Sequence, residues 1–174
     1  MDRRLTVSSP SEPRVRLRAA GQDDLESLRI WKNANKAGFF FKGEITREMQ
    51  AKWYEEYRAR PNDFMFIVED GGAPAGCMGF RILEGAAADT YNMIAAPHAK
   101  GKGVMKTAMI MMCSHIAEKF TKDIGCLVIK GNDALKYYEH CGYRIVGTAD
   151  GHEVLKVEWD SMKQIPVVST ESNG

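Results

Sequence analysis

Two glycines and three lysines gather in one short stretch near the middle of the chain. Gly101 and Gly103 stand one residue apart, with Lys100, Lys102 and Lys106 around them. Strand-like residues precede this stretch and helical residues follow it, so the glycines fall where a helix begins. Glycine lets backbone N–H groups close on an anion, and a helix N-terminus adds partial positive charge. The spacing therefore predicts an anion-binding loop, although a Gly-x-Gly pair by itself is more often only a tight turn.

The elements upstream of this loop follow from hydrophobic periodicity and capping signals. We expect one strand, two helices and three consecutive antiparallel strands. Gln22-Asp23-Asp24 offers caps for the first helix and Thr46-Arg47-Glu48 for the second. Asp70-Gly71-Gly72 predicts a hairpin turn within the strands that follow. The expected segments are a strand over 15–19, a helix from 25 that fades at 33–35, a helix through 57, strands over 64–69 and 75–83, and a strand ending near 94.

Downstream of the loop we expect a helix, a strand, a short helix and a final hairpin. Methionines cover more than one face of the helix over 104–120, which predicts burial on most of its sides. The strand over 125–129 is apolar throughout, as in a sheet covered on both faces. The short helix begins near Asn132 and stops at Gly142. The hairpin joins 144–148 to 152–158 about Asp150-Gly151.

This order of elements resembles the GNAT superfamily of acetyl-CoA-dependent N-acetyltransferases over roughly residues 14–159. Two motifs add to the resemblance. Residues 100–105 resemble the family's pyrophosphate loop, which is Arg or Gln, two residues, Gly, one residue, then Gly or Ala. Residues 134–143 resemble its Ala…Tyr…Gly-Phe helix and turn. The resemblance implies an α/β (α+β) fold, with a mixed, mostly antiparallel central sheet of about seven strands flanked by four helices, in the order β-α-α-β-β-β-α-β-α-β-β.

The resemblance also implies that acetyl-CoA is the cofactor, bound where two central strands diverge. Lys100 replaces the family's Arg or Gln but keeps a cation, whereas Met105 replaces a small residue. Asn132 lies one residue nearer Tyr138 than the family's CoA-contacting asparagine, whose place is taken by Gly131, so a plain helix cap explains it nearly as well. The positions carried over as cofactor-binding are Met93, Ile94, Ala95, Lys100, Gly101, Lys102, Gly103, Val104, Met105 and Asn132.

Two residues acquire catalytic roles from the resemblance. Tyr138, four residues before Gly142, has the position of the tyrosine that protonates the leaving thiolate; a helix-packing aromatic is the alternative. The N–H of Ile94 is expected to polarise the thioester carbonyl. The general base stays open, because Leu127 or Cys126 stands where some relatives carry a glutamate. The candidates near the groove are Asp89, Glu84 and His98.

The amine acceptor is expected to contact the irregular stretch over 33–53 and the final hairpin. Three consecutive phenylalanines there cannot all face one core, so at least one should line a groove or contact a ligand; a loop that plugs the domain's own core is equally compatible. The aromatic side chains could stack on a base or sugar, and Lys32, Lys36 and Lys42 could meet phosphates. The candidate substrate-binding residues are Phe39, Phe40, Phe41, Asp89 and His98.

This stretch is similar to bacterial GNATs of both the amino-sugar and the ribosomal-protein type. We therefore expect a small-molecule acceptor such as a nucleotide-linked amino sugar. Acetylation of a protein N-terminus or lysine is the alternative within the class. A non-catalytic acyl-CoA-binding module is the alternative outside it, and the Met105 substitution and the missing glutamate are the features that favour it.

Composition sets the remaining bounds. The 174 residues carry a net charge of +1, which favours neither nucleic acid nor an anionic membrane as a partner. No apolar run approaches the roughly 20 residues of a membrane span. The four cysteines lack zinc-site spacing and suit reduced thiols in a cytoplasmic protein without a metal.

We expect a mobile N-terminal tail over 1–14, one acetyltransferase domain over 15–159 and a loosely ordered C-terminal tail over 160–174. The sequence leaves a monomer and a homodimer both open.

Overall fold

The computed structural model describes residues 5–149, 151 and 153–171, which form one sheet and its covering helices. Across these residues the sheet has nine strands and there are four α-helices, so the predicted α/β class is confirmed. The strands are β1 (Leu5–Ser8), β2 (Val15–Ala19), β3 (Asp63–Asp70), β4 (Ala73–Ile82), β5 (Ala88–Ala95), β6 (Ile124–Ile129), β7 (Tyr143–Ala149), β8 (Val154–Trp159) and β9 (Val168–Glu171). The helices are α1 (Leu25–Ala34), α2 (Arg47–Arg58), α3 (Val104–Lys119) and α4 (Ala134–His140).

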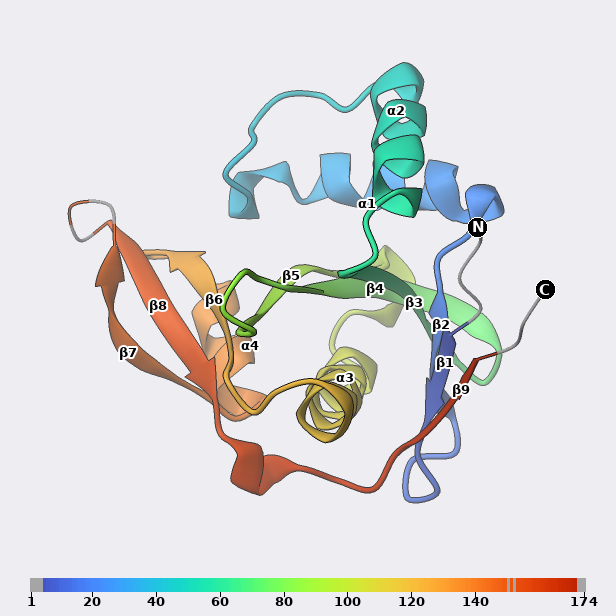
Figure 1. The fold of residues 1–174 in the computed structure, drawn as a ribbon. Coiled ribbons are helices and arrows are strands. Elements are labelled where there is room, and N and C mark those ends of the chain that lie inside the picture. Colours follow the sequence, from blue (N-terminus) through green and yellow to red (C-terminus); the bar gives the residue numbers. More distant parts are fainter. Residues whose placement is uncertain (1–4, 150, 152, 172–174) are drawn as a thin grey trace.

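The strands lie in the order β7-β8-β6-β5-β4-β3-β2-β1-β9. Every neighbouring pair is antiparallel except β5 and β6, which are parallel. The helices α1 and α2 cover one face of the sheet and α3 lies against the other (Figure 1). Strands β2 to β8 and the four helices occur in the order that the sequence predicts, with hairpin glycines at Gly71 (φ 59°) and Gly72 (φ 88°).

The two long helices form for different reasons. Thr46 caps α2, because its Oγ1 accepts the Met49 N–H at 3.2 Å. The helix α3 is buried on most sides, as predicted, and Met109, Met111 and Met112 are fully buried. The C-terminal segment passes along α3 on the side away from the sheet (Figure 1).

None of the helices in the described part of the chain combines the length and apolarity needed to cross a membrane.

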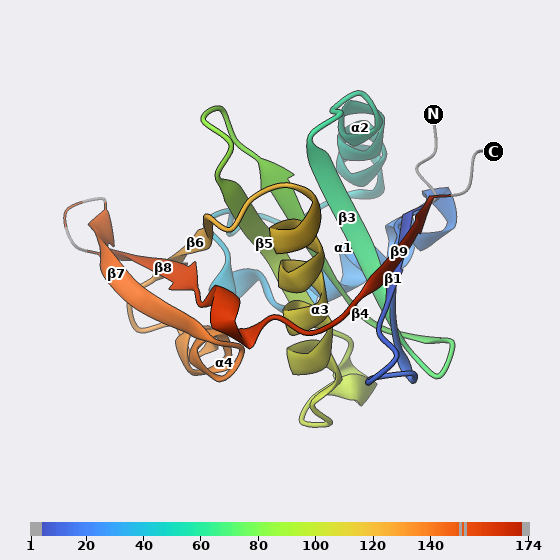
Figure 2. The ribbon, with the colours of Figure 1, turned by 60° about the horizontal axis from the view of Figure 1, so that its bottom comes forward.

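Two strands form within the stretches that the sequence predicts to be tails. Within the expected mobile tail, residues 5–8 form β1, whose Leu5 and Val7 are buried. Within the expected loose C-terminal tail, residues 168–171 form β9, which pairs with β1 at the edge of the sheet (Figure 2). These two strands bring the total to nine instead of about seven. Residues 1–4, 172–174, Asp150 and His152 of the expected tails and hairpin turn lie outside the described residues.

Candidate active site

The site begins where β5 and β6 diverge. The two strands pair only at Ala88 with Ile124 and at Asp89 with Gly125. Beyond these pairs β5 continues along β4 to Ala95, while β6 continues along β8. The edge of β5 that faces β6 therefore carries backbone groups that no strand in the described part of the chain pairs with. Leu127 of β6 is 46% exposed, so the expectation that this strand is covered on both faces is wrong.

A glycine loop lies at the end of β5, between it and α3. Gly101 and Gly103 have φ of 78° and 76°, and a Cβ on either would meet no atom within 4 Å. The first hydrogen bond of α3 runs from the Thr107 N–H to the Gly103 carbonyl, at 3.1 Å. The N–H groups of the three residues before Thr107 precede this bond and remain available to an anion. The loop can therefore bind an anion through its backbone.

A cavity of about 420 Å³, called the loop cavity below, opens against this loop. Lys100 and Lys106 contribute cations to its wall, together with Gly101, Gly103 and Met105. Met105 does not obstruct the loop, because its side chain packs over Gly76 of β4. A Cβ on Gly76 would lie 2.8 Å from the Met105 Sδ. The small residue that the family places at 105 is therefore replaced by a methionine that β4 accommodates.

The register of β5 decides which of its N–H groups point into the splay. The Ala96 N–H donates to the Ala75 carbonyl at 2.9 Å, on the side of β4. Since N–H groups alternate between the two sides of a strand, the N–H of Ile94 also points toward β4. Met93 and Ala95 point toward β6 instead. The N–H of Ile94, which is expected to polarise the thioester carbonyl, therefore points toward β4, and the N–H of Met93 points into the splay.

A bulge at Asn92 interrupts β5 next to Met93. The pairing with β4 shifts between Cys77 and Gly79, and Asn92 has φ of 54°. Asparagine tolerates this left-handed conformation better than most residues. Its side-chain Oδ1 accepts a hydrogen bond from Lys32 Nζ at 2.9 Å. The bulge thus connects the centre of β5 to α1.

Two further cavities meet the loop cavity around residues 92–94 of β5. The splay cavity, of about 630 Å³, lies between β5 and β6 and is lined by Asp89, Met93, Leu127 and Tyr138, with Phe39, Phe40 and Phe41 over it. The helix cavity, of about 220 Å³, lies on the side of α1 and α2. Met93 is shared by the loop and splay cavities, and Ile94 by the loop and helix cavities. A ligand entering along the loop could therefore meet a second ligand at this point of β5.

Adjacent tyrosines of α4 face different cavities. Tyr137 lines the loop cavity and donates its hydroxyl hydrogen to the Met105 carbonyl at 2.7 Å. Tyr138 lines the splay cavity, where its ring lies edge-on to Tyr143 with 5.4 Å between centroids. Burial raises the pKa of Tyr138 well above its ordinary value, so the hydroxyl remains protonated. Tyr138 can therefore donate a proton within the splay.

Asp89 is the only carboxylate among the described residues that line the three cavities. Burial raises its pKa above that of an ordinary aspartate, and its Oδ2 lies 3.8 Å from Arg81 Nε. The other two candidate bases lie elsewhere. His98 is exposed, with Nε2 3.0 Å from the Pro74 carbonyl, and Glu84 is exposed beyond the end of β4. Neither lines any of the three cavities described above.

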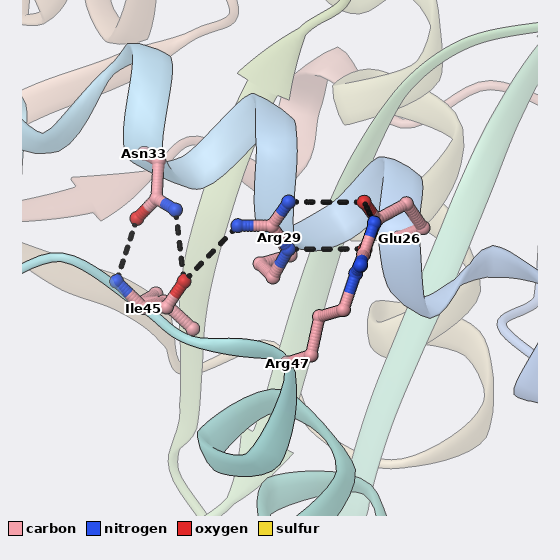
Figure 3. A network of polar contacts seen from close by, with 5 residues as sticks. All are labelled: Glu26, Arg29, Asn33, Ile45 and Arg47. Carbon is pink, nitrogen blue, oxygen red and sulfur yellow. Dashed lines mark hydrogen bonds and ion pairs between the residues drawn. The ribbon is translucent and has the colours of Figure 1, made fainter.

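The irregular stretch that covers the groove is attached to α1 at one end. Asn33 exchanges two hydrogen bonds with Ile45, at 2.8 and 3.0 Å, and Arg29 donates to the Ile45 carbonyl at 3.3 Å. Glu26 binds Arg29 and Arg47 together, each at 2.9 Å (Figure 3). This network holds Ile45 against α1, where its side chain lines the helix cavity.

The middle of the same stretch is attached across the groove. Asn132 donates to the Gly38 carbonyl at 3.2 Å and accepts the Ala134 N–H at 2.9 Å. Asn132 therefore caps the start of α4 and lines the splay cavity, away from the loop. Lys102 and Val104, also predicted to bind the cofactor, line none of these three cavities.

Sequence reasoning missed several residues that shape these cavities. An isolated glycine in a strand, such as Gly76, is a recognised sign of close approach, but it does not say what approaches. Nothing local marks Asn92 as a bulge or Lys32 as its partner. Arg81 also escaped notice, although its guanidinium lies 4.2 Å from the Tyr91 ring centroid and lines the splay cavity.

Comparison with known proteins places this geometry in context. Residues 14–144 match a family model described as an acetyltransferase (GNAT) domain. FdhC, a nucleotide-linked sugar GNAT, superposes with a TM-score of 0.71 at 18% identity over 86% of this chain and 88% of that one. Spermidine N-acetyltransferase from Vibrio cholerae, in complex with CoA and spermine, gives 0.68 at 21% identity over 83% and 94%.

A ribosomal L7/L12 alpha-N-protein acetyltransferase, RimL, in complex with CoA, gives a TM-score of 0.69 at 16% identity over 85% of this chain and 94% of that one. At these identities the likeness is one of fold. No match was found among curated proteins.

Proposed function

The chain belongs to the acetyltransferase (GNAT) domain family, and from this premise we propose that it transfers the acetyl group of acetyl-CoA to the primary amine of a small molecule. The observation that carries the proposal is the divergence of β5 from β6 with the glycine loop at its end. It offers an anion-binding loop, a strand edge with unpaired N–H groups and a buried tyrosine along one groove. Those are the groups that acetyl transfer from a CoA thioester requires.

The residues present fit CoA. Its pyrophosphate would meet the backbone N–H groups of the loop and the cations of Lys100 and Lys106, and the open positions beside Gly101 and Gly103 leave room for phosphate oxygens. Its pantetheine arm would lie along the edge of β5 as a partner strand does, with Ala95 supplying hydrogen bonds. When bound, acetyl-CoA supplies a thioester whose carbonyl the acceptor amine attacks.

Three groups of the chain would serve the transfer. The N–H of Met93 points into the splay and would stabilise negative charge on the carbonyl oxygen. Tyr138 would donate its proton to the leaving sulfur. Asp89, with its raised pKa, would accept the proton that the acceptor amine loses, directly or through water.

The walls of the acceptor side support a small molecule. Aromatic side chains line both acceptor cavities, among them Trp53 in the helix cavity and the three phenylalanines over 39–41 in the splay cavity. Lys32 and Arg81 outnumber the single carboxylate of Asp89 there. A groove for a basic peptide or a polyamine needs several carboxylates. Aromatic rings can stack on a base or sugar, and the cations can meet phosphates. We therefore favour a nucleotide-linked amino sugar as the acceptor.

The test uses release of the CoA thiol, measured over a panel of amino sugars, nucleotide-linked amino sugars, other amines and peptides. Tyr138→Phe should lower kcat by about 10²- to 10⁴-fold, the usual contribution of a positioned acid, with little change in acetyl-CoA affinity. Tyr137→Phe is the matched control. It removes one hydrogen bond to a helix carbonyl, which should cost about 1 kcal/mol of stability and leave kcat near that of the wild type.

The opposite result identifies the alternative of another class. A protein that binds acetyl-CoA, acetylates no amine and is unaffected by Tyr138→Phe is a non-catalytic acyl-CoA-binding module. Transfer to basic peptides in preference to sugars would instead indicate the protein-acetylating alternative.

A further inference from the structure

Lys32 is a cation in the acceptor groove without a carboxylate beside it. It extends from α1 between the helix cavity and the splay cavity and lines both. Within the described residues no aspartate or glutamate forms an ion pair with it. The next lysine along the chain differs, because Lys36 lies 3.3 Å from the Glu44 carboxylate.

The contacts that Lys32 does make leave its charge largely uncompensated. Its Nζ donates to Asn92 Oδ1 at 2.9 Å and lies 5.1 Å from the centroid of the Phe39 ring. An ammonium has three donors, and an amide oxygen and a ring face are weaker partners than a carboxylate. Burial lowers the pKa of Lys32, as expected where a charge loses water without gaining an anion. The positive Arg81 nearby acts in the same direction.

The surroundings make solvation a poor substitute for a partner. Apolar side chains, including Leu28, Ile45, Met49 and Trp53, line the helix cavity, and no carboxylate does so among the described residues. A cation in such a wall is costly unless an anion completes its contacts. The splay cavity, which Lys32 also lines, holds the carboxylate of Asp89, but that carboxylate is paired with Arg81 at 3.8 Å. A bound ligand can supply the anion that Lys32 lacks.

The position of Lys32 also sets where the anion must lie relative to the reaction. Its ammonium contacts the side chain of Asn92, and Met93, whose N–H points into the splay, is the next residue of β5. An anion on Lys32 would therefore lie close to the carbonyl position, on the side from which an acceptor enters.

We propose that Lys32 recognises an oxyanion of the acceptor, a carboxylate or a phosphate that lies within a few bonds of the reacting amine. The inference rests on the proposed function and narrows its substrate class to amines that carry a nearby negative charge. It also makes Lys32 a specificity residue that discriminates against polyamines, because a second ammonium would then face Lys32 and Arg81 in place of an anion.

Binding of probes that lack an amine tests this without turnover. Wild-type protein saturated with CoA is titrated with 3-phenylpropionate, phenyl phosphate and the neutral 3-phenylpropionamide by calorimetry. Intrinsic tryptophan fluorescence, to which Trp53 of the helix cavity contributes, is the second signal. We expect at least one anionic probe to bind about tenfold or more tightly than the amide, as for a charge-assisted hydrogen bond. The two anions distinguish a carboxylate site from a phosphate site.

Variants of Lys32 test whether its ammonium causes the preference for anionic probes. Lys32→Met should abolish it and Lys32→Arg should keep part of it. Lys32→Gln can still donate to Asn92, so it separates the loss of charge from the loss of that hydrogen bond, and it carries the test if Lys32→Met does not fold. Lys36→Met, a nearby lysine already paired with Glu44, should bind all probes as the wild type does.

Rates of acetylation provide a second test of the role of Lys32. Acetylation of L-phenylalanine is compared with L-phenylalaninamide, and of D-glucosamine 6-phosphate with D-glucosamine. For each substrate, kcat/KM of the wild type is divided by kcat/KM of Lys32→Gln, because this ratio cancels the effect of the different amine pKa values within a pair. Lys32→Gln should reduce kcat/KM for a charged member by about tenfold or more and leave its neutral counterpart within about twofold.

The inference is overturned if wild-type protein binds anionic and neutral probes equally, including the case in which none binds, or if Lys32→Gln keeps the anion preference. Transfer to amines without any preference for charged members would refute the inference and leave the proposed function intact. Lys32-dependent anion binding without acetyl transfer to any amine would refute the proposed function and leave the anion site at Lys32 intact.

Discussion

Replacing Gly76 by alanine tests the geometry that connects β4, β5 and Met105. A Cβ at this position would lie 2.3 Å from the Ile94 carbonyl oxygen, 2.8 Å from the Met105 Sδ and 3.1 Å from the Ala95 Cα, whereas ordinary contact begins near 3.4 Å. The methionine sulfur can move aside, because it belongs to a flexible side chain. The Ile94 carbonyl cannot move alone, so β5 must shift away from β4 by about 1 Å, the shortfall from ordinary contact.

Two effects of different size follow from that shift. Overpacking of this kind costs about 1–3 kcal/mol, and the upper end applies because the contact is with backbone. A domain of this size has about 5–15 kcal/mol of stability, so Gly76→Ala should still fold. The N–H groups of Met93 and Ala95 would move with β5, and losing both as ligands costs about 1–3 kcal/mol. The Kd for acetyl-CoA should therefore rise about tenfold, with a range of about 5- to 150-fold.

Urea unfolding followed by circular dichroism and calorimetric titration with acetyl-CoA measure the two effects. Gly147→Ala is the matched control, since Gly147 is also a strand residue but its added Cβ would meet nothing within 4 Å. Met105→Ala in the Gly76→Ala background should recover little, because the Ile94 contact persists. Wild-type stability and affinity in Gly76→Ala, or full recovery on removing the Met105 side chain, would refute the reasoning.

Three further perturbations test other parts of the structure. Burial lowers the pKa of His115 to about 4, so as the pH falls the unfolded chain takes up a proton on this histidine before the folded protein does. The unfolding free energy should therefore fall by about 2 kcal/mol between pH 7.5 and pH 5. Urea titrations at the two pH values measure this fall, and His115→Met should remove it. Gly103→Ala, at φ 76°, should lower the unfolding free energy by about 1–2 kcal/mol in the same assay, and a neutral result would mean that the loop is not held in this conformation. In the wild type kcat/KM should fall at low pH, with a midpoint above the pKa of an ordinary aspartate because burial raises the pKa of Asp89. Asp89→Asn should abolish this pH dependence. An unchanged pH profile would exclude Asp89 as the base.

Much of the fold and the place of the glycine loop could be predicted from local sequence. The caps at Thr46, the hairpin glycines at Gly71 and Gly72, and the periods of the strands and helices depend on residues a few positions apart. The glycine loop could be placed at the start of α3 for the same reason, because its conformation is a property of Gly101 and Gly103 themselves.

Predictions failed where the answer depended on residues far apart in the chain. The pairing of β1 with β9 joins the two ends of the chain, and each strand has only four residues, too few for a period to be recognised. His98 lies next to the loop in sequence, yet it turns toward Pro74 and away from the groove.

The sequence by itself determined the order of β2 to β8 with the four helices and the place of the glycine loop, because these follow from local patterns of side chains. The resemblance of that order and of two motifs indicated the family. Only the tertiary structure decided which N–H of β5 enters the splay, why Met105 fits, and what surrounds Lys32. Those features arise from the register of β5 on β4, from Gly76 opposite Met105, and from α1 packing on the bulge at Asn92. The physical reason is that register and packing are set by contacts between distant segments, which no short stretch of sequence contains.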